Sequence, residues 1–207
     1  MDGKCCDRPM TSTKLAVTIN DLVAEYEVRH EFRNESDESI EVIYSVPIPL
    51  DAAFMGMEAT IAGELLIAQV ISRDEAVGKY DGAVADGDSA ILLELLERGV
   101  LCLNLGNMLP GETGEIVLRF ATQLGAADGK ARFSLPLVHR PRYGRSGLKE
   151  FEALQHDVRI EHPFTATIRI EGLLAHAPLS CTSHNVLLVT EGGSRMLQLD
   201  QGMLDRD

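Results

Sequence analysis

Tryptophan is absent from this chain of 207 residues, and aromatic residues make up only 5% of it. Surfaces that stack on nucleic-acid bases or on sugar rings need exposed aromatic rings, so this scarcity argues against both. The net charge of −13 adds to the argument, because it repels nucleic-acid phosphates and anionic membrane surfaces. We therefore expect no nucleic-acid partner.

Long hydrophobic runs are missing as well. No stretch approaches the roughly 18 apolar residues that cross a membrane. The first residues, MDGKCCDRPM, lack the apolar stretch of a signal peptide. These absences predict no membrane span and favour the cytoplasm, where thiols stay reduced.

Cysteine is scarce, and no spacing pattern predicts a disulfide. Cys5 and Cys6 lie in the segment 1–12, which is polar, lacks periodicity and is expected to be disordered. Cys102 and Cys181 lie in apolar, strand-like contexts, where buried free thiols are expected. Pairing of Cys102 with Cys181 stays an open alternative.

Spacings typical of metal and catalytic centres are also missing. No histidine has a second histidine or a cysteine pair at ligand spacing. His30 falls on the apolar face of an expected strand, which is typical of a structural histidine. The sequence GRSG at 144–147 is one residue short of a nucleophile elbow. We expect no catalytic residue, no cofactor and no enzyme activity. The six histidines are His30, His139, His156, His162, His176 and His184.

One acidic, glycine-bearing segment, DGAVADGDS at 81–89, invites a calcium interpretation. Its candidate ligands are Asp81, Asp86 and Asp88. The segment lacks both the alternating acidic positions and the distal glutamate of a calcium-binding loop. Solvated aspartates at a turn are the simpler interpretation, so these three residues are only weak metal candidates.

What the sequence does contain is alternation. Leu15, Val17 and Ile19 share one face, and Tyr26, Val28, His30 and Phe32 share another, with charged residues between them. This period of two predicts half-buried antiparallel strands. Further strands are expected at 57–61, 64–71, 90–96, 101–105, 114–121 and 131–136. Strands at this spacing indicate an all-β sandwich, with Tyr26, Phe32, Tyr44, Tyr80 and Phe120 in its core.

The alternation lapses after residue 138. We interpret 139–156 as a connecting loop, and 157–207 as an additional β segment that either forms a small second layer or completes the same sandwich. The loop carries the one basic cluster of an acidic chain, which is a candidate for docking an acidic protein partner or another part of the same protein. Its members are Arg140, Arg142, Tyr143, Arg145 and Lys149.

The stretch 72–87 changes period and predicts one short helix. Ser72 and Glu75 are spaced as a capping box, and apolar residues then recur along one helical stripe from Ala76 to Val84. Glu75 and Lys79 are placed for an ion pair, and Gly87 marks the helix end. We expect the apolar stripe to pack on a sheet.

This helix also carries a resemblance. Its pattern R-x-E-A-x-x-x-Y-x-x-A, followed by a glycine and a strand ending in glutamate, resembles the vault protein inter-alpha-trypsin (VIT) domain. Further motifs of that family match around the helix, and the match extends over 13–138. The matching residues are Asn34, Glu41, Tyr44, Pro47, Pro49, Arg73, Glu75, Ala76, Tyr80, Ala83, Gly87, Ala90, Leu92, Glu94, Gly106, Asn107, Pro110, Gly111 and Glu112.

The resemblance implies a non-catalytic interaction or scaffolding module in a larger protein, with a von Willebrand factor A domain expected beyond residue 207. The expected fold is an antiparallel β-sandwich with one capped helix packed on it. An alternative from another class is a small-ligand or calcium-binding β-sandwich, using a cleft beside the helix or the acidic turn. The partner's identity and the oligomeric state stay open.

Overall fold

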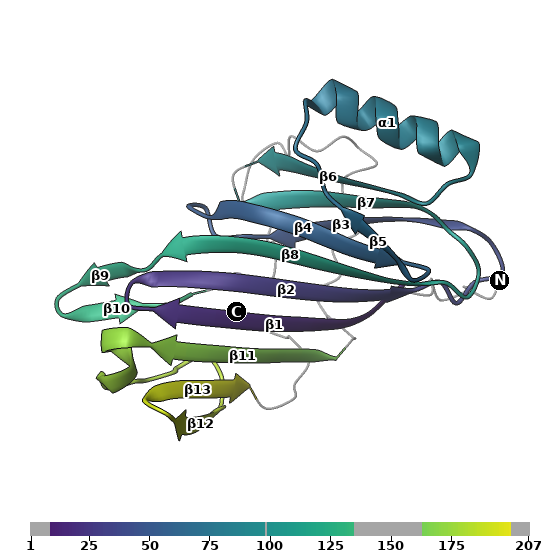
Figure 1. The fold of residues 1–207 in the computed structure, drawn as a ribbon. Helices are drawn as coiled ribbons and strands as arrows, with labels where there is room; N and C mark the ends of the chain where they lie inside the picture. The colour runs from purple at the N-terminus through teal and green to yellow at the C-terminus, as the bar shows by residue number, and fades with distance from the viewer. Residues whose placement is uncertain (1–8, 98, 135–162, 200–207) are drawn as a thin grey trace, which may run out of the picture.

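A computed structural model describes residues 9–97, 99–134 and 163–199 of the chain (Figure 1). Strands dominate this part, and a single α-helix lies across one end of them. In chain order the elements are β1 (Met10–Asn20), β2 (Val23–Arg33), β3 (Ile40–Pro47), β4 (Ala53–Ile61), β5 (Glu64–Ile67), α1 (Arg73–Asp86), β6 (Ala90–Glu97), β7 (Val100–Met108), β8 (Thr113–Gln123), β9 (Gly125–Ala127), β10 (Lys130–Arg132), β11 (Phe164–Glu171), the 3-10 helix η1 (Gly172–His176), β12 (Val186–Glu191) and β13 (Ser194–Leu199).

Two sheets form a sandwich with a shared core, and β9 and β10 pair separately in a two-stranded sheet. Eight strands pair in the order β12-β13-β11-β1-β2-β8-β4-β5, and three pair in the order β3-β7-β6. Buried side chains of both sheets belong to one hydrophobic cluster, in which Val17 and Phe120 of the larger sheet join Leu103 and Leu105 of the smaller one. The predicted fold class, mostly β with one packed helix, is confirmed.

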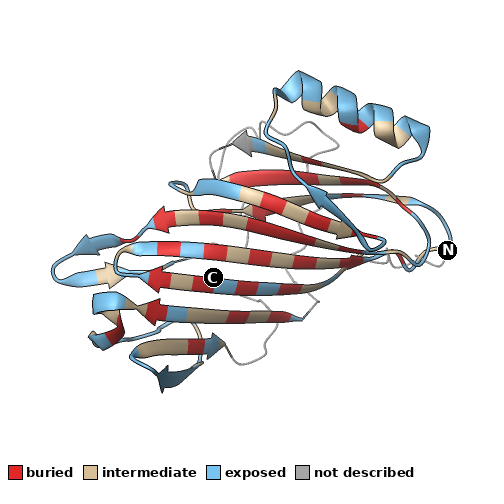
Figure 2. Ribbon diagram, viewed as in Figure 1, coloured by how far each residue is buried: buried red, intermediate tan, exposed pale blue. Residues whose placement is uncertain are grey.

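The alternation seen in the sequence is the inside–outside pattern of the sheets (Figure 2). Along β2, every second residue from Ala24 to Phe32 is buried, and the residues between are more exposed. Tyr26 stacks on Phe120 of the neighbouring strand, with ring centroids 4.6 Å apart. Of the aromatic residues expected in the core, only Tyr44 is partly exposed, and it still packs against the core.

The outer face of the large sheet carries rows of opposite charge. Arg119 on β8 pairs with Glu27 on β2 and with Glu58 on β4, each at 3.0 Å. Arg29 pairs with Glu115 across the same strands. Such half-exposed pairs each contribute little to stability, but they make this face polar and pair its charges with one another.

One pair of strands differs from the expected antiparallel arrangement. β11 runs parallel to β1, with Thr13 opposite Phe164 and Asn20 opposite Glu171, so the large sheet is mixed rather than antiparallel. Alternation reports that a strand is half-buried but not its direction, which depends on how the chain returns to the sheet. Strands β11 and β13 thus extend the same sheet beyond β1.

The N-terminal segment is ordered earlier than expected. β1 begins at Met10, which lies opposite Phe32, and the Arg33 amide donates to the Pro9 carbonyl at 2.7 Å. The prediction of disorder through residue 12 is therefore wrong for residues 10–12. Pairing with β2 supplies their backbone hydrogen bonds, which no local sequence signal shows.

Cys102 and Cys181 are not joined to each other, so the open disulfide alternative is excluded. Cys102 is buried on β7, as expected. Cys181 is exposed, contrary to the prediction, because it lies in a loop between η1 and β12 and not in a strand.

Candidate functional site

Helix α1 begins and ends where the sequence predicts, but its N-terminal cap differs. Ser72 occupies the N-cap position with extended backbone, yet its side chain makes no cap hydrogen bond. The Glu75 carboxylate pairs instead with Lys79 at 2.9 Å, so the predicted capping box is wrong. At the other end, Gly87 adopts a left-handed conformation with φ of 89°, as a C-terminal glycine should.

The apolar stripe of α1 faces the smaller sheet, and two polar contacts hold it there. Tyr80 is buried with 8% of its surface exposed, and its hydroxyl donates to the Glu41 carboxylate on β3 at 2.7 Å. Arg73 pairs with Glu94 on β6 at 2.6 Å. These bonds join the helix to both edge strands of the three-stranded sheet.

The strand between them, β7, receives the C-terminal half of α1. Gly106 faces the helix so closely that a Cβ there would lie 2.6 Å from Val84 Cγ2 and 2.9 Å from the Tyr80 hydroxyl. The Asn107 side-chain amide donates to the Val84 carbonyl at 2.7 Å and to the Asp88 carbonyl at 3.2 Å. Many motif residues of the predicted VIT pattern therefore fix the position of α1.

We expect the Tyr80→Phe variant to show a pH-dependent loss of stability. Burial raises the pKa of the Tyr80 hydroxyl well above its usual value, and the hydrogen bond to Glu41 and the charges of Glu41 and Asp81 raise it further. Near pH 8 the variant should lose about 1 kcal/mol of unfolding free energy, the usual contribution of one hydrogen bond.

This difference should shrink as the pH rises. A raised pKa in the folded state stabilises the protein below the unfolded value of about 10, and that stabilisation is lost above it. Urea unfolding of both proteins between about pH 8 and 11 measures the effect. A difference that stays constant over this range contradicts the role assigned to the Tyr80 hydroxyl.

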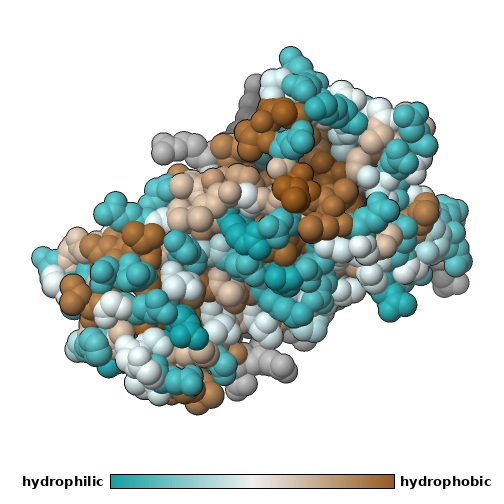
Figure 3. All heavy atoms as spheres, viewed as in Figure 1, coloured by the Kyte–Doolittle hydropathy of each residue, from teal (hydrophilic) through white to brown (hydrophobic). Residues whose placement is uncertain are grey.

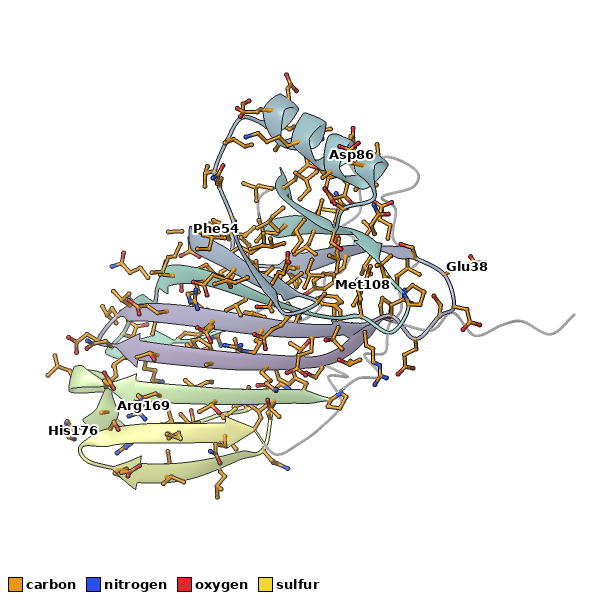
Figure 4. The ribbon with its side chains drawn as sticks, turned by 45° about the vertical axis from the view of Figure 1, so that its right-hand side comes forward. Glu38, Phe54, Asp86, Met108, Arg169 and His176 are labelled. Atoms are coloured by element: carbon orange, nitrogen blue, oxygen red, sulfur yellow. The ribbon has the colours of Figure 1, made fainter. Side chains whose placement is uncertain are left out.

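A groove of about 990 Å³, which we call the α1 groove, lies between α1 and the strands of the two sheets. It is bounded by β4 and β5 on one side, by β6 on the other, and by the segment 68–71 that leads toward α1. In Figure 4, side chains project from α1 and from the strands beneath it toward one another. Its apolar lining residues include Leu50, Phe54, Met57, Leu66, Ile67, Val70, Ile71, Leu93, Leu95 and Leu101.

Hydrophobic side chains are exposed around this groove to an unusual degree. Val70 is 92% exposed, Ile67 72%, Leu95 65% and Leu65 62%. Figure 3 shows a hydrophobic area beside α1. Contiguous apolar patches of this kind mark interaction or ligand sites on globular proteins.

The charged residues in the lining of the groove are Arg73, Lys79 and Glu94, and each is held in one of the ion pairs described above. Tyr80 also lines the groove, and its hydroxyl is bonded to Glu41. Its volume lies within the range of small-molecule pockets, about 300–1,000 Å³. The arrangement can therefore bind an apolar ligand or apolar side chains of a partner.

The predicted site residues lie elsewhere. Asp81 and Asp86 are exposed on α1 and Asp88 is exposed just after it. Over the described ranges, no group of three or more histidine, cysteine, aspartate or glutamate side chains is arranged to hold a metal ion. Within those ranges no helix is long and apolar enough to cross a membrane. The basic cluster Arg140, Arg142, Tyr143, Arg145 and Lys149 falls outside the described residues, as does the connecting loop 139–156.

Sequence reasoning placed a cleft beside the helix only as an alternative and did not identify its residues. A signal was present in ELLIAQVI at 64–71, an apolar run with neither helical nor strand periodicity. We expected one strand over this run, whereas β5 ends at Ile67 and the rest crosses to α1.

Comparison with known proteins agrees with the motif pattern. Residues 10–120 match the family described as the Vault protein inter-alpha-trypsin domain, VIT. The chain is 31% identical over 191 residues to von Willebrand factor A domain-containing protein 5A of Homo sapiens, covering 85% of this chain and 24% of that protein. The Rattus norvegicus protein of the same name is 29% identical over 215 residues, covering 96% and 26%.

A third relative is protein mono-ADP-ribosyltransferase PARP4 of Mus musculus, 29% identical over 142 residues, with 69% of this chain and 7% of that protein covered. Among solved structures, an M1 zinc metallopeptidase from Deinococcus radiodurans aligns with a TM-score of 0.41 and 12% identity, over 95% of this chain and 40% of that one. A likeness this weak establishes no common function. The chain spans only about a quarter of the two von Willebrand factor A relatives.

Proposed function

Because this chain belongs to the VIT domain family, we propose that it is a non-catalytic interaction module whose binding surface is the α1 groove. Its partner is a protein or another domain of the same polypeptide. The observation that carries the proposal is the exposed apolar lining, with Val70 92% and Ile67 72% exposed beside a helix that is fixed in place. The relatives that contain a von Willebrand factor A domain support a multidomain setting.

The rest of the surface supports this choice. The outer face of the large sheet is occupied by its own ion pairs, such as Arg119 with Glu27 and Glu58. The groove instead leaves apolar area in water, and covering it would release about 25 cal/mol for each Å². An interface there needs no catalytic group, which fits a lining whose charged residues, Arg73, Lys79 and Glu94, are already paired.

The Val70→Asp variant should bind the partner at least about tenfold more weakly, because a charge would be placed in an apolar interface. The measurement titrates the proposed partner, a separately purified domain of the same polypeptide, into the chain by calorimetry. Val70 makes little contact with the fold, so circular dichroism and the unfolding midpoint should not change.

Val23→Asp is the matched control. Val23 is also an exposed valine, at 47%, but it starts β2 and does not line the groove. It should leave the affinity unchanged. Equal loss in both variants would show that the groove is not the binding surface, and absence of any binding would remove the proposal of docking within one polypeptide.

Binding of a small apolar ligand is the second candidate, and the groove's volume of about 990 Å³ favours it. For calcium, the arrangement of Asp81, Asp86 and Asp88 offers no such support. We expect about 1 mM calcium chloride to move the unfolding midpoint by less than about 1 °C, since only a ligand of the folded state raises it. A rise of several degrees that disappears in the Asp81→Asn, Asp86→Asn, Asp88→Asn variant would restore the calcium interpretation.

A further inference from the structure

We propose that the free edge of β5 binds an extended strand of a protein partner, whose alternate apolar side chains enter the α1 groove. This inference rests on the proposed function and names the kind of partner and its mode of binding. Recognition of this kind uses main-chain hydrogen bonds for affinity and side-chain pockets for specificity.

β5 is the last strand of the large sheet within the described residues. It follows β4 through a two-residue turn, Ala62 and Gly63, both with positive φ, and Leu65 lies opposite Thr60. Such turns join tight hairpins, in which hydrogen-bonded and non-hydrogen-bonded pairs alternate from the turn outward.

The alternation sets which backbone groups are free. The Ala68 amide donates to the Met57 carbonyl at 3.2 Å, so residues two apart from Ala68 also point toward β4. The backbone N–H and C=O groups of Leu65 and Ile67 therefore point away from the sheet. Their side chains are 62% and 72% exposed, so the outer edge is open to another strand.

In the described part of the chain, this edge lacks the features by which proteins usually prevent edge pairing. Proline, inward charges, bulges and covering elements are the common protections. Between Leu65 and Ile67 there is no charge and no proline, and the register of β4 with β5 shows no bulge. An unprotected apolar edge of this kind is the geometry at which strands are added.

The groove lies where side chains of an added strand would contact the protein. Leu66 and Ile67 line it from the β5 side, and Leu93 and Leu95 line it from β6. A strand paired to Leu65 and Ile67 would direct every second side chain toward this lining. An acyl chain or other small apolar molecule could fill the groove, but it would leave the outward N–H and C=O groups unpaired, so we favour a polypeptide.

The charge near the groove indicates which flanking residues the partner strand carries. From the start of β5 through the first turn of α1, the acidic residues are Glu64, Asp74 and Glu75, of which Glu75 pairs with Lys79, and the basic one, Arg73, pairs with Glu94. The whole chain carries −13. A strand with alternate apolar residues and basic flanks is therefore the complementary ligand.

The test is selection of a random twelve-residue peptide library on the complete chain. We expect enriched peptides with apolar residues at every second position and lysine or arginine at the ends. Synthetic copies of the best peptide, with and without N-methyl groups on alternate amides, are then titrated by fluorescence polarisation. An N-methyl group removes an N–H donor from the peptide. Only one of the two alternate sets of amides would pair with β5, so N-methylation of that set should weaken binding at least about tenfold.

Ile67→Pro is the corresponding change in the protein. It removes an outward N–H without touching the bonds to β4, as proline at an edge position does, and should weaken the peptide about tenfold or more. Ile67→Val keeps the N–H and a β-branched side chain and should change affinity less than about threefold. If Ile67→Pro fails to fold, the N-methylated peptides still decide the question.

No enrichment of alternating peptides overturns the inference, as does binding that survives N-methylation of both sets of amides or is unaffected by Ile67→Pro in the folded variant. The proposed function is judged separately. If Val70→Asp still weakens the natural partner while no strand-like peptide binds, the groove is an interaction surface and strand addition is not its mode.

Discussion

Replacing Asn34 by alanine should lower the free energy of unfolding by about 3 kcal/mol, because it leaves several buried polar groups without a hydrogen-bond partner. Asn34 is fully buried, and its amide donates to the carbonyls of Met108 and Glu38, each at 2.8 Å. Its side-chain oxygen accepts from the Ser36 amide at 2.9 Å. Figure 4 shows Met108 near the end of the sandwich and Glu38 on the loop beyond it, the two places that Asn34 connects.

The measurement is urea unfolding at neutral pH, with the midpoint of thermal unfolding expected to fall by about 6–12 °C for a chain of this size. Ser36→Ala is the control, because Ser36 lies in the same turn but leaves the buried Met108 carbonyl paired with Asn34. It should cost about 1 kcal/mol or less. Equal losses in the two variants would mean that the turn, and not the buried amide, provides the stability.

Gly106→Ala should cost about 2–3 kcal/mol, an effect of overpacking. The added methyl group would lie 2.6 Å from Val84 Cγ2 and 2.9 Å from the Tyr80 hydroxyl. Helix α1 must move away from β7, and the Asn107 bond to the Val84 carbonyl would be lost with it. Amide hydrogen exchange should show faster exchange in α1 than in the wild type, while β1 and β2 stay protected.

Gly82→Ala is the matched control with the opposite sign. Gly82 lies inside α1, and a Cβ there meets nothing within 4 Å. Alanine in an exposed helix interior should stabilise the protein by about 0.5–1 kcal/mol. If Gly106→Ala is neutral or stabilising like Gly82→Ala, the close packing of α1 on β7 is not what fixes the helix.

Much of this architecture could be predicted because it follows local rules. The alternation around Tyr26 and Phe32 determined the buried face of β2, and the change of period at Ser72 determined a helix ending at Gly87. The spaced motifs identified the family. These signals depend on residues within a few positions of each other, where period and turn chemistry suffice.

Tertiary structure alone decided what those residues contact. The partners of Tyr80 and Asn34 lie 39 and 74 residues away, at Glu41 and Met108. The parallel direction of β11, the early start of β1 and the lost capping box likewise depend on neighbours that only folding supplies. The α1 groove is the clearest case: its lining comes from strands of both sheets and one helix, and a run such as ELLIAQVI has no period that marks it as a rim. Sequence determines which side chains must leave water, whereas a surface left open arises only where packed elements fail to cover one another.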